Sequence, residues 1–219
     1  FYLWDYVASG EGKRISRDGY YEYKKIIWEG KVMKAIILAA GQGTRLKKYT
    51  ENLPKGMLSF MGKTIIERQI EIYRKCRIDK IIIIRGFAAE KICYEGVTYY
   101  TNENYDSTNM VVSLMAAKQE FDEDVIVSYS DILFEEQMLQ NYVVAVDDNW
   151  KAYWEKRYGR VDFDTESLSL DSENNIKELG LENPKLNDID ARYVGLLKFS
   201  RKGLEYIKQI YDDACRNYK

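Results

Sequence analysis

The chain contains no histidine, and this absence excludes several mechanisms at once. A serine or cysteine nucleophile activated by a histidine base is excluded, and so is zinc held by imidazole. Cysteine is scarce as well: Cys76, Cys93 and Cys215 are widely spaced and form no C-x-x-C pair, which indicates reduced thiols and no metal cluster. Any chemistry must therefore depend on carboxylates, cations and a metal ion held by oxygen ligands.

Long apolar runs and an excess of charge of one sign are also missing. No apolar stretch approaches the roughly 20 residues that span a bilayer, and no signal-peptide pattern opens the chain. Lysine and arginine number 33 against 35 acidic residues, so no bulk electrostatic attraction to nucleic acid or an anionic membrane exists. We expect a cytoplasmic protein whose basic site is local.

The character of the sequence changes near residue 32. Residues 1–32 are aromatic-rich and charged, and we interpret them as an N-terminal appendage or the tail of an upstream fused domain. From Met33 onward, apolar runs alternate with amphipathic segments, which predicts a separate domain over residues 33–219. Strands are predicted at 34–38, 80–85, 97–101, 124–130, 142–146 and 192–200, helices at 64–76, 110–121 and 201–218, and a hairpin turn at 172–175.

This alternation predicts an α/β fold. The expected architecture is Rossmann-like, with three α/β/α layers and a mostly parallel sheet that has an antiparallel C-terminal portion. The clearest helix begins after Thr64, which forms a T-x-x-E capping box with Glu67. In such folds ligands bind at the carboxyl ends of the parallel strands.

A glycine loop follows the first predicted strand, in the segment LAAGQGTRL. Gly41 and Gly43 allow backbone N–H groups to approach an anion, because glycine has no Cβ and tolerates positive φ. A dinucleotide fingerprint would need a third glycine where Leu46 stands, and a Walker A loop would need one where Met57 stands. A turn whose glycines serve geometry alone stays open for this loop by itself.

Together with the later segment LPKGMLSFMGKTIIERQI, the loop resembles nucleotidyltransferases of the sugar-phosphate and phosphocholine or phosphonate cytidylyltransferase type, in the MobA-like NTP transferase superfamily. The resemblance extends through VSYSDILF and RYVGLLKFS and covers roughly residues 33–200. It implies a nucleotidyltransferase domain with Mg²⁺ as cofactor and Asp131 in the metal-binding position. The family signature, G-x-G-T-R-L followed by P-K, is met at Gly41, Gly43, Thr44, Arg45, Leu46, Pro54 and Lys55.

The residues themselves support a triphosphate site. Loop N–H groups would bind the phosphates, while Arg45 and Lys55 would neutralise their charge. A phosphate monoester has a second pKa of about 6, so it can attack an α-phosphorus without a general base. We predict Lys55, Arg45 and Asp131 as catalytic, with Asp131 as the metal ligand or, alternatively, a helix N-cap. The predicted nucleotide-binding residues are Leu38, Ala39, Ala40, Gly41, Gly43, Thr44 and Gly86.

Several aromatic and acidic residues follow the strand predicted at 142–146. A cationic headgroup such as choline would suit aromatic faces near a carboxylate. The alternatives are packing of these aromatics against the sheet and, for an asparagine before a predicted helix, an N-cap role. The predicted acceptor-binding residues are Asn109, Asp147, Trp150, Tyr153 and Trp154.

The predicted function is transfer of CMP from CTP to a small phosphorylated or phosphonylated acceptor of the phosphocholine or 2-aminoethylphosphonate type. A sugar-1-phosphate nucleotidyltransferase is one alternative, and a non-catalytic nucleotide-binding regulatory module is another. The family's second metal-binding carboxylate is not found, so we expect residues 33–219 to lack their C-terminal end. The expected partners are CTP or another NTP and the acceptor. We expect no binding to nucleic acid or membrane, and the sequence is compatible with a homodimer.

Overall fold

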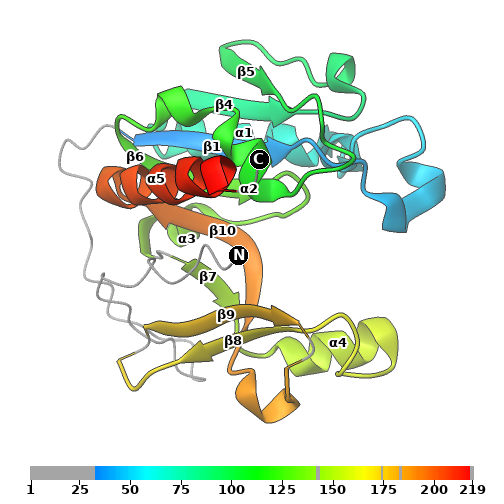
Figure 1. Ribbon diagram of the computed structural model, residues 1–219. Coiled ribbons are helices and arrows are strands. Elements are labelled where there is room, and N and C mark those ends of the chain that lie inside the picture. Colours follow the sequence, from blue (N-terminus) through cyan, green and yellow to red (C-terminus); the bar gives the residue numbers. More distant parts are fainter. Residues whose placement is uncertain (1–32, 142–143, 174, 183, 218–219) are drawn as a thin grey trace. The chain divides into compact units, whose positions relative to one another are not determined.

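A computed structural model describes residues 33–141, 144–173, 175–182 and 184–217. These residues divide into two compact units (Figure 1). The larger unit contains the described residues of 33–141 and 195–217, and the smaller unit those of 144–194. The predicted appendage, residues 1–32, lies outside the described residues.

The larger unit is built on a mostly parallel sheet. Strand β1 pairs in parallel with β4 on one side and with β6 on the other, and β4 pairs in parallel with β5. Residues 196–199 of β10 run antiparallel to β6. This arrangement confirms the predicted fold class. The strands are β1 (Met33–Ala39), β4 (Lys80–Arg85), β5 (Val97–Thr101), β6 (Asp124–Tyr129) and β10 (Arg192–Phe199), with a short hairpin of β2 (Ser59–Phe60) and β3 (Lys63–Thr64).

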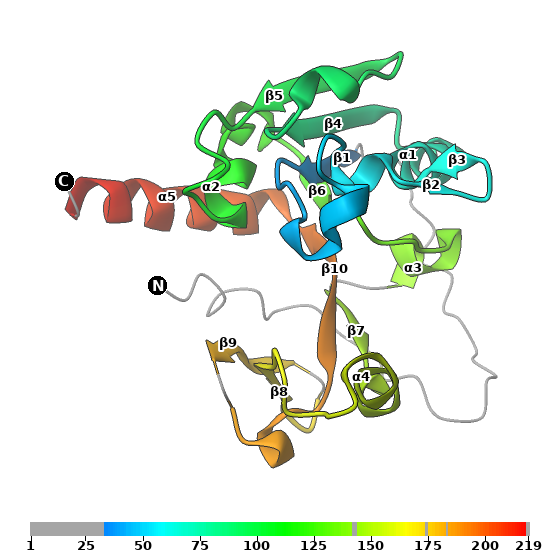
Figure 2. The same cartoon turned by 90° about the vertical axis from the view of Figure 1, so that its right-hand side faces the viewer.

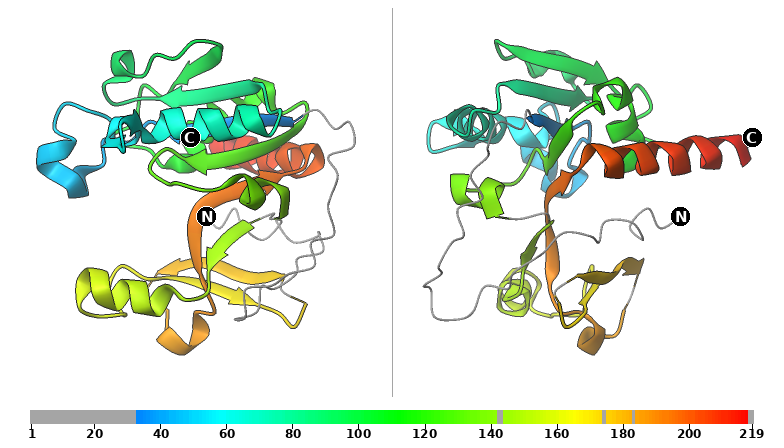
Figure 3. Two further views of the ribbon diagram at one scale, coloured as in Figure 1. Left: turned by 180° about the vertical axis from the view of Figure 1, so that it is seen from behind. Right: turned by 90° about the vertical axis from the view of Figure 1, so that its left-hand side faces the viewer.

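Helices cover both faces of this sheet, and α1 and α3 lie on the face opposite to α2 and α5 (Figure 2). The four isoleucines of β4 are fully buried as a result, which explains why its sequence shows no alternation of apolar and polar residues. Figure 3 shows α1 crossing one face of the sheet. The helices are α1 (Ile65–Lys75), α2 (Met110–Met115), α3 (Glu136–Asn141) and α5 (Arg201–Asn217).

The first helix begins and ends where the sequence predicted. The hydroxyl of Thr64 accepts a hydrogen bond from the backbone N–H of Glu67 at 3.0 Å, and Cys76 is the C-cap. The helix predicted at 110–121 is instead interrupted, because i→i+3 hydrogen bonds tighten the chain after Met115. Short 3-10 helices occur at Thr44–Tyr49, Lys55–Met57, Ala89–Lys91, Lys118–Glu120 and Leu186–Asp188.

The smaller unit contains β7 (Val144–Asp147), α4 (Trp150–Tyr158) and an antiparallel hairpin of β8 (Glu166–Leu170) and β9 (Ile176–Glu182). The hairpin and β7 were predicted, although residues 142–143 and 174 lie outside the described residues. Helix α4 was not predicted.

The order of the six-stranded sheet is β5-β4-β1-β6-β10-β7. None of the described helices is both long and apolar enough to cross a membrane.

A charged cluster surrounds the buried Lys34 of β1. The ammonium of Lys34 donates hydrogen bonds to the carboxylates of Glu120, at 3.0 Å, and of Asp122. Glu120 also binds the ammonium of Lys80 at 2.8 Å and the hydroxyl of Tyr100 at 2.7 Å. Burial would raise the pKa of Glu120, but the hydrogen bonds from Lys80, Tyr100 and Lys34 lower it to about 2.

Replacing Lys34 by methionine should lower the free energy of unfolding at pH 7 by about 2 kcal/mol, because the carboxylate of Glu120 loses a hydrogen bond from a charged donor. The lowered pKa means that ionised Glu120 stabilises the fold above pH 4.5, and that this contribution disappears as the pH falls towards 2. Urea denaturation should therefore show a difference in free energy of unfolding between wild type and variant that becomes smaller as the pH is lowered towards 2. An equal free energy of unfolding at pH 7 would contradict the role assigned to Lys34.

Candidate active site

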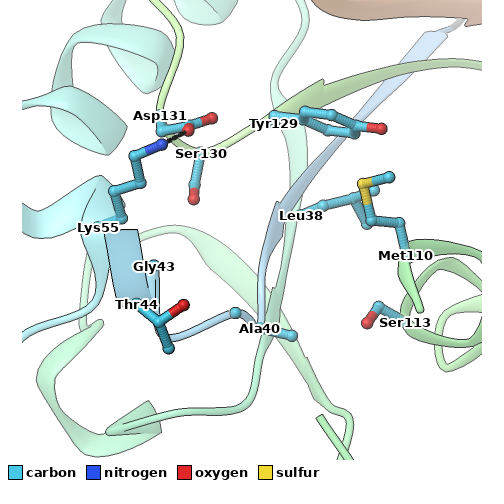
Figure 4. A pocket seen from close by; sticks show the side chains of 11 residues that line it. Leu38, Ala40, Gly43, Thr44, Lys55, Met110, Ser113, Tyr129, Ser130 and Asp131 are labelled. Atoms are coloured by element: carbon cyan, nitrogen blue, oxygen red, sulfur yellow. Dashed lines mark hydrogen bonds and ion pairs between the residues drawn. The ribbon is translucent and has the colours of Figure 1, made fainter. Parts of the chain in front are cut away.

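The predicted phosphate loop, Lys55 and Asp131 meet in one pocket of the larger unit (Figure 4). The strands β1 and β6 are parallel neighbours, so the loops that follow them leave the same edge of the sheet. The pocket has a volume of about 310 Å³, in the range of sites for small molecules. It is lined by Leu38, Ala40, Gly41, Gly43, Thr44, Lys55, Met110, Ser113, Tyr129, Ser130 and Asp131.

Glycines bring the three segments of the pocket close together. Gly43 has a φ of +73°, and a Cβ at this position would lie 3.0 Å from the Cβ of Lys55. A Cβ on Gly56 would lie 2.7 Å from the backbone oxygen of Ser130. The hydroxyl of Thr50 donates a hydrogen bond to the carbonyl of Gly43 at 2.9 Å, which holds the loop. Close backbone packing therefore preforms the pocket.

Lys55 and Asp131 form an ion pair inside the pocket (Figure 4). Their side chains are 34% and 26% exposed, so a ligand in the pocket can reach both charges. Asp131 lies in a turn, five residues before α3 begins at Glu136, and therefore does not cap that helix. The alternative role as an N-cap is not what the structure shows, and the catalytic and metal-binding roles stay predictions.

The donor set of this pocket fits one magnesium ion that arrives with a nucleotide. Mg²⁺ is usually bound through one or two carboxylates, substrate phosphates and waters. Asp131 supplies one carboxylate next to the loop that would hold the phosphates. Among the described residues, no three side chains of Asp, Glu, Cys or His form a ready-made metal cage.

Gly86 packs against the loop, and Ala39 lies in the strand that precedes it. A Cβ on Gly86 would lie 2.6 Å from the carbonyl oxygen of Ala40, and the backbone N–H of Phe87 donates to that oxygen at 2.9 Å. Gly86 therefore sets the shape of the loop and does not line the pocket. Ala39 is the last residue of β1 and is buried. Arg45 lies in the 3-10 helix after the loop, and its side chain is outside what the structure describes.

Asn109 has the capping role that was the alternative to substrate contact. Its side-chain oxygen accepts hydrogen bonds from the backbone N–H groups of Val111 at 3.0 Å and Val112 at 3.2 Å. The cap fixes the start of α2, from which Met110 and Ser113 reach the pocket. Asn109 thus positions residues that line the pocket, and direct contact with a substrate stays a prediction.

The other predicted acceptor residues belong to the smaller unit. Trp150 and Trp154 are only 1% and 9% exposed and pack in the core of this unit, and the guanidinium of Arg192 lies 4.1 Å from the ring centre of Trp154. This burial favours the packing alternative for both tryptophans. Tyr153 is 51% exposed, and Asp147 is half-buried. Tyr153 is thus the predicted aromatic with an accessible face.

Sequence reasoning missed four residues that line the pocket: Met110, Ser113, Tyr129 and Ser130. Tyr129 and Ser130 directly precede Asp131 at the end of a predicted strand, and their position was a usable signal. No local signal marks Met110 and Ser113, because they reach the pocket only through the packing of α2 on the sheet.

A mostly parallel sheet with a glycine loop, a lysine and an aspartate around one pocket is an arrangement in which an α/β protein can hold a phosphorylated ligand. The family model of the MobA-like NTP transferase domain matches residues 35–207. The chain therefore belongs to the MobA-like NTP transferase family and is a nucleotidyltransferase, which confirms the predicted family.

The relatives include several cytidylyltransferases. The chain is 32% identical over 203 residues to the CTP:phosphoglutamine cytidylyltransferase of Campylobacter jejuni, which covers 84% of this chain and 80% of that protein. It is 41% identical over 106 residues to the choline-phosphate cytidylyltransferase of Streptococcus pneumoniae, or 47% of this chain and 46% of that one. The structure of CTP:phosphocholine cytidylyltransferase from Streptococcus pneumoniae matches with a TM-score of 0.65 and 26% identity, over 83% of this chain and 78% of that one.

Proposed function

We propose that the chain transfers CMP from CTP to a small phosphorylated or phosphonylated acceptor and releases pyrophosphate. The observation that carries this proposal is the meeting of the glycine loop, Lys55 and Asp131 in one pocket. Cytidine as the base is supported by the cytidylyltransferases among the relatives. Their acceptors, phosphoglutamine and phosphocholine, are small phosphorylated molecules, which supports the same class of acceptor here.

The chemistry needs little more than charge and position. An oxygen of the acceptor phosphate forms a bond to the α-phosphorus of CTP, and the bond from that phosphorus to the α,β-bridging oxygen breaks. Backbone N–H groups around Gly41 and Gly43 bind the phosphates, and the ammonium of Lys55 neutralises charge on them. Asp131 would hold Mg²⁺, which when bound supplies further charge stabilisation. Preorganised groups of this kind act without a general base, in agreement with the absence of histidine.

Pyrophosphate release should be measured for each of the four NTPs with phosphocholine, 2-aminoethylphosphonate, phosphoglutamine and glucose 1-phosphate. Release that requires CTP and one of the first three acceptors is the expected result. Release with glucose 1-phosphate alone would establish the sugar-phosphate alternative. Nucleotide binding without any release would favour the regulatory module, although such a module has no evident need for the paired Lys55 and Asp131.

The acceptor hypothesis is tested at the exposed aromatic. Replacing Tyr153 by leucine keeps apolar volume but removes the electron-rich face, so binding of phosphocholine should weaken about tenfold, or 1.4 kcal/mol. Calorimetry should show unchanged affinities for CTP and glucose 1-phosphate. Trp154→Leu is the control for packing, because this ring is buried and its loss should lower stability without selectivity. Equal losses for all three ligands in Tyr153→Leu would identify Tyr153 as a packing residue.

A further inference from the structure

The pocket has two chemically different ends (Figure 4). One end is strongly polar and the other is mostly apolar, with a single hydroxyl from α2. A nucleotide carries its charge on the phosphates, so the phosphates belong at the polar end and the flat, uncharged base at the apolar end. The polar end is formed by Gly43, Thr44, Lys55, Ser130 and Asp131, and the apolar end by Leu38, Ala40, Met110, Ser113 and Tyr129.

An aromatic ring forms a fixed wall at the apolar end. Gly195 has a φ of +89°, and a Cβ there would lie 2.8 Å from Cδ2 of Tyr129. The ring therefore rests directly on the backbone of β10, which limits its movement. Aromatic side chains of this kind suit flat bases because every base has a π-face.

Ser113 is the polar residue of this end, and its hydroxyl is already partly used. The side chain lines the pocket although the residue is only 6% exposed. The hydroxyl accepts a hydrogen bond from Nδ2 of Asn102 at 3.0 Å and donates its proton to the carbonyl of Asn109 at 3.4 Å. A serine hydroxyl has one proton and two lone pairs. With its proton directed to Asn109, Ser113 presents its remaining lone pair to a ligand and acts as a hydrogen-bond acceptor.

We propose that Ser113 selects the base of the nucleotide, an inference that rests on the proposed function. The remaining lone pair accepts a hydrogen bond from the 4-amino group of cytosine. Uracil and thymine have a carbonyl oxygen at the same position, and two acceptors would then face each other. A site with a committed hydrogen-bonding group rejects the mismatched ligand because buried polar groups stay unpaired. Ser113 thus favours CTP over UTP.

Calorimetric titration of the full chain with CTP and UTP, in the presence of Mg²⁺, tests this assignment. Wild type should bind CTP about tenfold more tightly than UTP. Ser113→Ala should weaken CTP binding about tenfold and leave UTP binding unchanged. Thr108→Val is the matched control, because Thr108 is the other acceptor of the Asn102 amide, at 2.9 Å, but does not line the pocket. It should leave the ratio of the two affinities unchanged.

A second probe uses unaltered protein in case Ser113→Ala fails to fold. A triphosphate whose base is pyrimidin-2-one lacks the 4-amino group, and wild type should bind it about tenfold less tightly than CTP. The proposal would be overturned if wild type bound UTP or the pyrimidin-2-one triphosphate as tightly as CTP. It would also be overturned if Ser113→Ala lowered the affinities for CTP and UTP by the same factor. Selective binding of CTP without pyrophosphate release would contradict the proposed function but leave the role of Ser113 in base selection intact. Release with UTP and CTP alike would contradict the role of Ser113 and the choice of cytidine as base, but not nucleotidyl transfer to the acceptor.

Discussion

Replacing Lys55 by methionine should reduce kcat/KM for pyrophosphate release by about 10²–10³-fold, the size expected when one preorganised charge is removed from a transition state. Methionine keeps the stem that packs against Gly43, so the loop should retain its shape. The loss should come mainly from the chemical step, because negative charge increases on the phosphates as the leaving group departs. Steady-state kinetics with CTP and the acceptor identified by the pyrophosphate assay give this measurement.

Lys63→Met is the matched control for this variant. Lys63 pairs with Glu71 outside the pocket and is about as exposed as Lys55. Turnover of Lys63→Met should equal that of wild type, and both variants should unfold at the wild-type temperature. Wild-type turnover in Lys55→Met would remove Lys55 from the catalytic residues. The remaining cation predicted on the loop, Arg45, would then need the same test through Arg45→Ala.

Replacing Asp131 by asparagine should lower turnover about 10²–10³-fold at low Mg²⁺ and shift saturation to higher Mg²⁺ concentrations. Asparagine keeps an oxygen that can accept from Lys55, but it loses the negative charge that a hard cation requires. Activity measured over a series of Mg²⁺ concentrations separates the two effects, because a weaker metal site is partly rescued by more metal.

Glu136→Gln makes the same change of charge at the start of α3, outside the pocket, and should leave the dependence on Mg²⁺ unchanged. A normal dependence in Asp131→Asn would show that Asp131 serves only to hold Lys55. Combining Asp131→Asn with Lys55→Met distinguishes these roles further. If both residues act on the same transition state, the double variant should lose less turnover than the product of the two single reductions predicts.

The amino-acid sequence by itself determined the strands of the main sheet, the helix that begins after Thr64, and the family. Runs such as KIIIIR predict a strand because four consecutive isoleucines, which are β-branched, suit a strand covered on both faces. Thr64 and Glu67 fix a helix start through one local hydrogen bond. The glycine loop stood out because glycine allows the backbone to approach an anion closely, and the P-K pair was recognisable through its match to the family signature.

Tertiary structure decided the roles that depend on distant parts of the chain. The sequence pattern around Trp150 and Trp154 is compatible with aromatics that face a ligand and with aromatics that pack in a core. Only the packing of α4 within its unit shows that both side chains are buried. Gly86 was predicted to bind the nucleotide, and only the structure shows that its missing Cβ makes room for the carbonyl of Ala40. Ser113 carried no signal, since its importance depends on Asn102 and Asn109 using part of its hydroxyl and on α2 bringing it to the pocket. Local hydrogen bonds and hydrophobic periodicity are encoded by neighbouring residues, whereas the direction in which a side chain faces a ligand depends on contacts between segments far apart in the sequence.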